Sequence, residues 1–295
     1  MKKLALCAIA VGLIGTPAFA ADMGVPPTAP PAPVYNWTGW YVGVNVGASM
    51  GKVQSDFNVN DVHVHTNDGN FTVFGFSNRD FVSPDGVIGG GQIGYNWQFS
   101  PLWVVGFEAD FQGADEKDSA TLIHPFDFTA VDVGLEDGHN NHVTGSRVLN
   151  YSAQIDWFGT VRARFGYVWG DGRVFSYVTG GLAYGEVKTD GTSTFSGSVG
   201  TPIGPANSFD IAHSIGHSHV NTGWVLGYGT EGAIDFWGAH NWTWRIETYY
   251  MDLGHLNDTD SAVYVPTVLS VNGGQVTTNS HFTDWILRGG LNYRF

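Results

Sequence analysis

The last fifteen residues, HFTDWILRGGLNYRF, constrain the fold most, because apolar and polar side chains alternate along them. Successive side chains of a β-strand point to opposite faces, so the alternation predicts a strand with one apolar and one charged face. A soluble sheet would turn the apolar face to a core, whereas a barrel in a membrane would turn it to lipid. Three more segments alternate in the same way, so we interpret this one as a transmembrane barrel strand. Its apolar row is Trp285, Leu287, Gly289, Leu291, Tyr293 and Phe295, and its polar row is Asp284, Arg288, Asn292 and Arg294.

The first twenty residues predict export. Lys2 and Lys3 precede an apolar run, and Ala18-Phe19-Ala20 offers the small residues of a cleavage site. We therefore expect a signal peptide over residues 1–20. No later stretch approaches the ~18 consecutive apolar residues that a transmembrane helix needs. Cys7 is the only cysteine and lies inside this signal, so we expect no disulfide in the mature chain.

The chain is acidic, with 13 basic and 27 acidic residues, and loss of Lys2 and Lys3 makes the mature chain more negative still. This charge disfavours nucleic acid and anionic head groups as partners. Charged residues are only 14% of the chain, which is low against the ~25–35% of a soluble surface. We therefore expect a large part of the surface to face something other than water.

The remaining sequence divides into a linker and one domain. Residues 21–36 are rich in proline and predict an extended periplasmic linker. Residues 37–295 hold eight strand-like segments, which form an all-β domain. The predicted fold is an eight-stranded antiparallel up-and-down transmembrane β-barrel with four long outer loops and three short periplasmic turns. The predicted strands are 37–49, 86–98, 102–112, 151–169, 174–187, 222–234, 242–253 and 281–295.

The connections alternate between long and short, and this pattern predicts the orientation. Long polar stretches cover about 50–85, 113–150, 188–221 and 254–280, while short turns lie at 99–101, 170–173 and 238–241. Outer-membrane barrels have short periplasmic turns and long outer loops. We therefore expect both ends of the domain on the periplasmic side.

The segment 151–169 has the longest alternation. If it is one regular strand, one row faces lipid and the other faces the lumen. The expected outward row is Tyr151, Ala153, Ile155, Trp157, Val161, Ala163, Phe165 and Tyr167, and the expected inward row is Ser152, Gln154, Asp156, Thr160, Arg162 and Arg164.

Charged residues on the inward rows predict an ion-pair network in the lumen. An eight-stranded barrel is just wide enough for side chains to fill it, and an unpaired buried ion costs several kcal/mol. We expect Arg162, Arg245 and Arg288 to neutralise Glu108, Glu231 and Glu247 in one layer that plugs the barrel. A gated pore would need this plug to rearrange. The predicted network is Glu108, Asp110, Asp156, Arg162, Arg164, Glu231, Arg245, Glu247 and Arg288.

Histidines in the outer loops raise the possibility of a metal or haem site. His63 and His65 are two residues apart, as are His217 and His219, with His213 nearby, and such a pair shares one face of a strand. Loose loops seldom preorganise a site, so we expect surface histidines, no bound metal and no cofactor. The carboxylates of the loops do not follow a calcium-loop pattern.

Four polar residues fall near the outer rim, where barrel enzymes carry their catalytic groups. Their spacing matches no catalytic motif, and no G-x-S-x-G occurs. We therefore expect a protein that is not an enzyme. The four residues are His142, Ser152, Asp252 and His281.

Three segments carry a family resemblance: WTGWYVGVNVG after the signal and spacer, GGLAYG, and the final LNYRF. They resemble the small eight-stranded outer-membrane barrels of Gram-negative bacteria, most of all the RopB-type alphaproteobacterial porin-family proteins, which are related to opacity and OmpA-like barrels. The resemblance implies a place in the cell outer membrane and a role in envelope integrity and surface contact, with haem binding in some members. By the same resemblance Leu291, Tyr293 and Phe295 form a C-terminal signal for the barrel-assembly machinery.

Three functions remain open at this point. A structural, non-catalytic barrel with a plugged lumen and a role in surface interaction is the first. A small-solute porin is the second, and a haem- or metal-binding surface receptor that uses its histidine-containing loops is the third. Expected partners are outer-membrane lipids, lipopolysaccharide, periplasmic chaperones and the assembly machinery, with no nucleic acid, and we expect a monomer.

Overall fold

The computed structural model describes residues 35–66, 69–73, 75–131, 140–200, 207–234, 241–260, 270–273 and 275–295. The predicted signal peptide and residues 21–34 of the linker lie outside the described residues. Tyr35 and Asn36, which we assigned to the linker, are described and belong to the same compact unit as the strands, Tyr35–Phe295.

The described chain is built of β-strands. None of its residues forms a helix with the length and apolar character needed to cross a bilayer. The strands are β1 (Gly39–Val59), β2 (Val62–Thr66), β3 (Gly69–Val73), β4 (Phe76–Val82), β5 (Asp85–Ser100), β6 (Trp103–Val131), β7 (Asn140–Trp169), β8 (Val174–Gly200), β9 (Asn207–Ala233), β10 (Trp242–Asp260), β11 (Ser270–Gly273) and β12 (Val276–Arg294).

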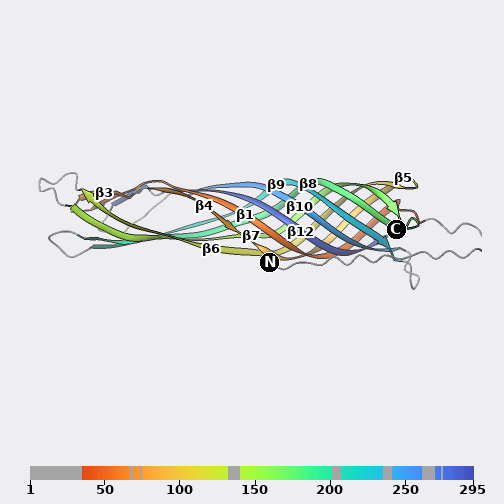
Figure 1. Ribbon diagram of the computed structural model, residues 1–295, viewed down its shortest axis with the longest axis horizontal. Coiled ribbons are helices and arrows are strands. Elements are labelled where there is room, and N and C mark those ends of the chain that lie inside the picture. Colours follow the sequence, from red (N-terminus) through yellow and green to blue (C-terminus); the bar gives the residue numbers. More distant parts are fainter. Residues whose placement is uncertain are drawn as a thin grey trace, which may run out of the picture. The chain divides into compact units, whose positions relative to one another are not determined.

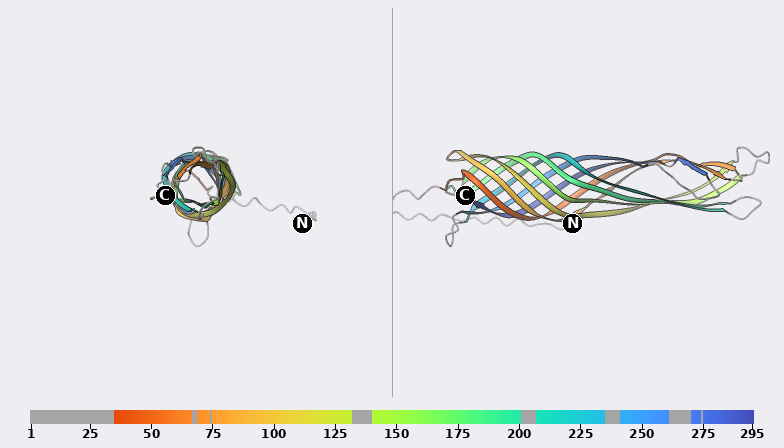
Figure 2. Two further views of the ribbon diagram at one scale, coloured as in Figure 1. Left: turned by 90° about the vertical axis from the view of Figure 1, so that its left-hand side faces the viewer. Right: turned by 180° about the vertical axis from the view of Figure 1, so that it is seen from behind.

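One nine-stranded antiparallel sheet closes into a ring. Its order is β12-β10-β9-β8-β7-β6-β5-β1-β4, and pairing of β12 with β1 completes the closure. Figure 2 shows the ring end-on and the tilted strands from the side. Within the described residues, β4 pairs with β1 alone. The all-β, antiparallel barrel is thus confirmed.

Large apolar side chains cover the outer face of the ring, where a soluble protein would carry polar groups. Leu182 is 69% exposed and Val44 is 66% exposed. Two belts of touching aromatic rings flank this band. One includes Trp40, Trp103, Tyr167, Trp242 and Tyr293. The other, the upper belt, consists of Phe111, Trp157, Tyr184, Trp224, Tyr250 and Trp285. An apolar band between two aromatic belts is the surface of a transmembrane barrel.

The prediction of four long loops is wrong over most of their length. β6 has 29 residues and β7 has 30, against the ~9–11 residues that cross a bilayer. The strands continue past the upper belt as a long narrow structure, seen on the left of Figure 1. We call it the outer extension: residues 51–59, 76–82, 114–131, 140–156, 186–200, 207–223, 253–260 and 276–284. A separate sheet, β11-β2-β3, is formed by parts of two predicted loops.

Within the outer extension the barrel changes toward two facing sheets. β9 pairs with β10 from Ala233 to Trp224, and no further pairing joins these two strands in the described chain. Four strands, β6 to β9, remain together on one side, and β10, β12, β1 and β4 on the other. The extension is therefore able to hold a core between the sheets, as a β-sandwich does.

Bulges near the upper belt reverse which side chains face inward. In β7 the register shifts between Ile155 and Trp157, and in β10 it shifts between Asp252 and Gly254. Because side chains alternate with a period of two, one extra residue exchanges the two faces of the strand. The expected outward positions of Tyr151, Ala153 and Ile155 are therefore wrong.

The residues turned inward by the β7 bulge belong to the core of the extension. Ala153 is fully buried and Ile155 is 1% exposed. They pack with Val53, Phe57, Val187, Leu256 and Phe282, among others, in one apolar cluster. The physical reason is the change of surroundings: below the bulge lipid faces the outer wall, whereas above it water does, so apolar side chains turn to the interior.

The opposite end of the barrel is closed by the residues that precede β1. Trp37 is fully buried and packs with Val104, Val168, Phe175 and Tyr177. Its indole Nε1 donates a hydrogen bond to the carbonyl oxygen of Gly172 at 2.9 Å. Gly172 lies in the turn between β7 and β8, where positive φ angles at Gly170, Asp171 and Gly172 favour glycine.

Candidate functional site

A buried network of charged side chains occupies the lumen at the level of the apolar band. β6 supplies Glu108 and Asp110, β7 supplies Arg162 and Arg164, and the remaining members come from β9, β10 and β12: Glu231, Arg245, Glu247 and Arg288. All eight are buried, and none exceeds 5% exposure. Four carboxylates thus face four guanidinium groups, so the network is neutral when all eight are ionised.

Glu108 lies at the centre of this network. Arg245 binds both of its oxygens, with Nη1 at 2.6 Å from Oε2 and Nη2 at 3.0 Å from Oε1. Arg162 Nη2 lies 2.5 Å from Oε1. The hydroxyl of Tyr41 donates to Oε2 at 2.7 Å. Such bidentate, charge-assisted bonds are the strongest hydrogen bonds of proteins.

The other carboxylates are also held by more than one donor. Asp110 Oδ2 accepts from Arg288 at 2.8 Å and from Thr160 at 2.9 Å. Glu247 pairs with Arg245, Arg162 and Arg288, and the Tyr177 hydroxyl donates to it at 2.9 Å. These bonds offset the cost of removing the charges from water.

The pairing of Glu231 differs from the one we predicted. Arg164 Nη2 lies 2.7 Å from Glu231 Oε2. The other oxygen accepts from Thr243 at 2.6 Å and from Asn292 at 2.8 Å. Arg162, Arg245 and Arg288 instead share Glu108 and Glu247.

Aromatic rings line the guanidinium groups, and we did not predict these contacts from the sequence. Arg164 lies over the Tyr177 ring at 3.9 Å, and Arg162 and Arg288 both face Tyr249. A cation over a ring face is attracted by its quadrupole. The sequence could have indicated these contacts, because Tyr177 and Tyr249 lie on the inward rows of their strands. Two glycines leave room for tyrosine side chains. A Cβ atom added at Gly94 would lie 2.2 Å from the Tyr41 hydroxyl oxygen, and one added at Gly229 would lie 2.6 Å from Cζ of Tyr177.

The placement of Asp156 in the lumen network is wrong. The bulge in β7 turns this residue to the outer wall, where Lys188 and Gln154 bind its carboxylate. Partial burial acts to raise the pKa of Asp156, but the hydrogen bonds from Lys188 and Gln154 outweigh it and lower the pKa. Sequence spacing could not reveal this, because a bulge adds one residue without a composition signal.

Above the network lies a second polar layer with an unusual carboxyl group. Ser49 Oγ donates to Asp284 Oδ1 at 2.6 Å. Glu116 is fully buried, and neither of its oxygens has a hydrogen-bond partner among the described residues. Burial, and secondly the nearby Asp284, raise the pKa of Glu116 to about 9. Glu116 therefore stays protonated at neutral pH.

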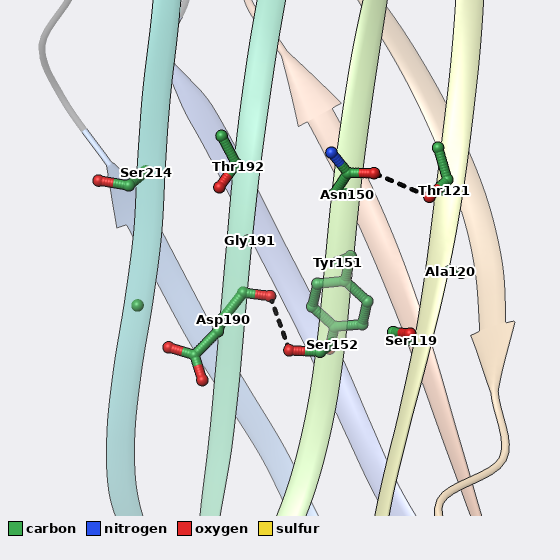
Figure 3. A pocket seen from close by; sticks show the side chains of 11 residues that line it. Ser119, Ala120, Thr121, Asn150, Tyr151, Ser152, Asp190, Gly191, Thr192 and Ser214 are labelled. Carbon is green, nitrogen blue, oxygen red and sulfur yellow. Dashed lines mark hydrogen bonds between the residues drawn. The ribbon is translucent and has the colours of Figure 1, made fainter.

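A polar groove lies on the wall of the outer extension across β6, β7, β8 and β9 (Figure 3). It has a volume of about 700 Å³. Thr121 Oγ1 donates to Asn150 Oδ1 at 2.8 Å, and Ser152 Oγ donates to the main-chain oxygen of Asp190 at 3.3 Å. Gly216 adds no side chain on the β9 side. The groove thus offers hydroxyl, amide and carboxylate groups, which suit a ligand rich in hydroxyls.

Those of the singled-out histidines whose side chains are described do not form one cluster. His63 Nδ1 contacts Thr72 Oγ1 at 2.9 Å in the small sheet, and His217 Nδ1 lies 2.7 Å from Asp258 Oδ2. The side chains of His65 and His213 lie outside the described residues. Among the side chains that are described, no group of three or more His, Cys, Asp or Glu could hold a metal ion.

The four rim residues do not come together at one place, and the contact among them is between His281 and Asp252. His281 Nε2 lies 3.0 Å from Asp252 Oδ1 across β12 and β10. His142 Nε2 lies 3.0 Å from Asp127 Oδ1 across β7 and β6. Ser152 lies in the groove, apart from both histidines. The structure also places His255, which was not among the predicted site residues, directly opposite His281.

The predicted C-terminal signal lies on the lipid-facing side of β12. Phe295 is 76% exposed, and its ring packs edge-on against Tyr293 at 5.4 Å. Its main-chain nitrogen donates to the carbonyl oxygen of Trp40 at 3.1 Å. The last residue therefore takes part in the closure of the ring between β12 and β1.

The sequence matches known outer-membrane proteins along its full length. The family model for the outer membrane protein beta-barrel domain matches residues 7–295. The 31 kDa outer-membrane immunogenic proteins of Brucella melitensis biotype 1 and Brucella suis biovar 1 are each 34% identical over 306 residues, which covers 100% of both chains.

Solved structures are similar at a lower level. Ail, the attachment invasion locus protein of Yersinia pestis, is 12% identical with a TM-score of 0.28, over 87% of this chain and 99% of that chain. The outer membrane protease OmpT from Escherichia coli is 9% identical with a TM-score of 0.30, over 87% and 97%. The match of the family model and the Brucella relatives lead to one conclusion: this chain belongs to the outer-membrane proteins with a β-barrel domain and is located in the cell outer membrane.

Proposed function

We propose that this protein is a closed, non-catalytic barrel that supports the integrity of the outer membrane and presents a surface for contact outside the cell. In this proposal eight strands, β1, β5 to β10 and β12, cross the membrane. Residues 1–20 act as a cleaved signal peptide, and the linker that follows it, residues 21–36, lies in the periplasm with the short turns. The protein acts as a monomer.

The buried, charge-balanced network is the observation that carries the proposal. Its eight members project from β6, β7, β9, β10 and β12 into the same part of the lumen, and each carboxylate is bound by a guanidinium group. Opening a path for solutes would separate these pairs, and a separated pair costs several kcal/mol. The cluster around Trp37 at one end and the apolar core of the extension at the other support closure as well. This packing favours a structural role over a porin.

Planar-bilayer recordings on the refolded full-length mature protein test this function. We expect no stable conductance steps from the wild-type protein. An Arg245→Ala variant, which frees Glu108 and Glu247 of one partner, should give brief openings. Glu186→Ala is the matched control, since it removes a carboxylate from the outer wall, where Trp157 and Ser218 bind it. Stable, ohmic conductance steps from the wild-type protein would show that it is a porin and not a closed barrel.

The outer wall supports the non-catalytic part of the proposal. Each rim histidine contacts one carboxylate, and in the described chain no hydroxyl is hydrogen-bonded to His281 or His142. A nucleophile would have to lie within reach of such a base. Hydrolysis or acyl transfer on lipid substrates by the purified protein would contradict this part of the proposal.

The groove of Figure 3 supports the role in surface contact. Ser152, the lining residue of β7 nearest the upper belt, lies five positions beyond Trp157, so the groove starts roughly 16 Å from the belt along the strand at ~3.3 Å per residue. The sugar region of lipopolysaccharide lies outside the membrane and offers many hydroxyls. We propose it as the partner, beside the membrane lipids. Asn150→Leu should weaken binding of purified lipopolysaccharide, whereas Thr144→Leu, farther along the outer row of β7, should not. Equal binding of lipopolysaccharide by both variants would show that the groove is not its binding site.

The remaining proposed partners are the factors that assemble the barrel. Leu291, Tyr293 and Phe295 form an exposed apolar row on the last strand, and periplasmic chaperones and the barrel-assembly machinery are the factors that read such a row. Leu291 and Tyr293 also pair β12 with β1 in the folded ring, and the main-chain nitrogen of Phe295 donates to Trp40.

A further inference from the structure

Two histidines face each other on the outer wall of the extension. His255 of β10 and His281 of β12 are direct partners in the antiparallel register. Their rings stack with centroids 4.3 Å apart and planes inclined by 10°. His281 lies four positions beyond Trp285 of the upper belt, which is roughly 13 Å along the strand. The pair is therefore outside the lipid region and accessible to ions from water.

The hydrogen bonds of His255 determine which of its nitrogens carries the proton. Asn279 Nδ2 donates to Asn257 Oδ1 at 2.6 Å, so the other amide atom of Asn279, Oδ1, faces His255. An amide oxygen only accepts. His255 Nδ1, at 2.9 Å from it, therefore carries the hydrogen. In the neutral ring, the lone pair is then on Nε2.

The hydrogen bonds of His281 give the opposite tautomer. Asp252 Oδ1 accepts from the main-chain nitrogen of Gly254 at 2.8 Å and lies 3.0 Å from His281 Nε2. A carboxylate accepts hydrogen bonds, so Nε2 is the protonated nitrogen. The lone pair of the neutral ring is then on Nδ1. Each histidine thus has one nitrogen held by a polar partner and one free to act as a ligand.

We propose that His255 and His281 bind one divalent transition-metal ion, such as Zn²⁺ or Ni²⁺, on the outer surface of the protein. Imidazole nitrogen is a preferred ligand of these metals. Metal-binding histidines usually donate their second N–H to a carboxylate or carbonyl group, and Asp252 and Asn279 occupy these positions. The carboxylate of Asp252 also gives the site a negative charge that favours a cation.

The geometry places limits on this site. Two histidines from the protein are too few to fill a tetrahedral shell, so water completes it. The stacked rings must rotate about their side-chain torsions before both lone pairs point at one ion. His255 is exposed and His281 retains 32% of its side-chain exposure, so the rings have room to turn. The site is therefore weaker than a closed structural zinc site.

Calorimetric titration of the full-length mature protein with ZnCl₂ tests the proposal. The protein carries no affinity tag and is folded in detergent micelles. We expect His255→Ala and His281→Ala each to remove one equivalent of bound Zn²⁺. His142→Ala is the matched control, because His142 has a carboxylate partner, Asp127, but lies on the other sheet of the extension. It should leave this equivalent unchanged. Heat-dependent gel mobility shows that each variant is folded.

A second variant separates a metal site from simple ring packing. Asn279→Ala leaves both imidazoles in place but removes the acceptor that orients His255. Loss of such a partner typically weakens metal binding by 10–100-fold, and we expect a loss in this range with the stoichiometry intact. Acid should also abolish binding, because a protonated ring has no lone pair. Identical Zn²⁺ titrations of the wild type and the His255→Ala/His281→Ala double variant would overturn the proposal, as would an equal loss in His142→Ala.

Discussion

Arg245 and Glu108, on strands β10 and β6, meet inside the barrel through two parallel hydrogen bonds of 2.6 Å and 3.0 Å. Neither side chain is exposed to solvent. The two strands are not neighbours in the sheet order, so this pair links opposite parts of the wall. It shows how a narrow barrel uses its lumen: charges that could not face lipid pair across the interior.

The first prediction concerns this pair. Glu108→Ala or Arg245→Ala should each lower the free energy of unfolding by about 3–5 kcal/mol, because the remaining charge is buried without its main partner. The double variant should lose less than the sum of the two. Urea unfolding followed by tryptophan fluorescence measures all three values. Strict additivity, or losses no larger than that of Glu186→Ala on the outer wall, would show that the pair does not stabilise the barrel.

The second prediction distinguishes the two halves of β7. Ile155→Ala should cost about 2–5 kcal/mol, since it leaves a cavity in the core of the extension. Val161, which is 52% exposed in the apolar band, should tolerate alanine at a smaller cost. Val161→Arg should cost roughly 2–4 kcal/mol when the protein is folded in bilayers. If Ile155→Ala and Val161→Ala behave alike, the bulge in β7 does not reverse the strand.

The third prediction concerns the last residue. Deletion of Phe295 removes an exposed ring of the aromatic belt and the hydrogen bond to Trp40. We expect the shortened protein to accumulate in the periplasm, whereas Phe295→Tyr should reach the outer membrane. Cell fractionation with heat-dependent gel mobility follows both variants. Folded protein in the outer membrane after the deletion would contradict an assembly role for Phe295.

The fourth prediction uses the buried carboxyl of Glu116. Its pKa is raised from 4.5 to about 9 by burial and by Asp284. Between these two pH values the unfolded chain loses the proton but the folded chain keeps it. Stability therefore falls as the pH rises through this range. Glu116→Gln should be more stable than the wild type at pH 8, and its unfolding should depend less on pH between 5 and 8.

Urea unfolding at several pH values measures this effect. Glu186→Gln, a change on the partly exposed outer wall, serves as the control and should keep the pH dependence of the wild type. A Glu116→Gln variant with an unchanged pH profile would show that Glu116 ionises normally in the folded protein.

The sequence alone determined the strands of the membrane region and the faces of their side chains. A period of two and the cost of a charge in lipid are enough to place Arg162, Arg245 and Arg288 inside and Val161 and Leu287 outside. The short turns follow from local residues such as Gly170 and Gly172. These features depend on neighbours along the chain, and a single sequence carries that information.

The tertiary structure decided everything that depends on residues far apart in the chain. A bulge is one extra residue relative to a partner strand, so it cannot be seen until the strands pair, and it moved Asp156 outside and Ile155 inside. Strand register also determines that Glu231 pairs with Arg164 and that His255 lies opposite His281. We predicted loops for the polar outer segments, although they form strands. The apolar side chains of these strands are buried only in the core between the two sheets. That core exists only after the sheets face each other.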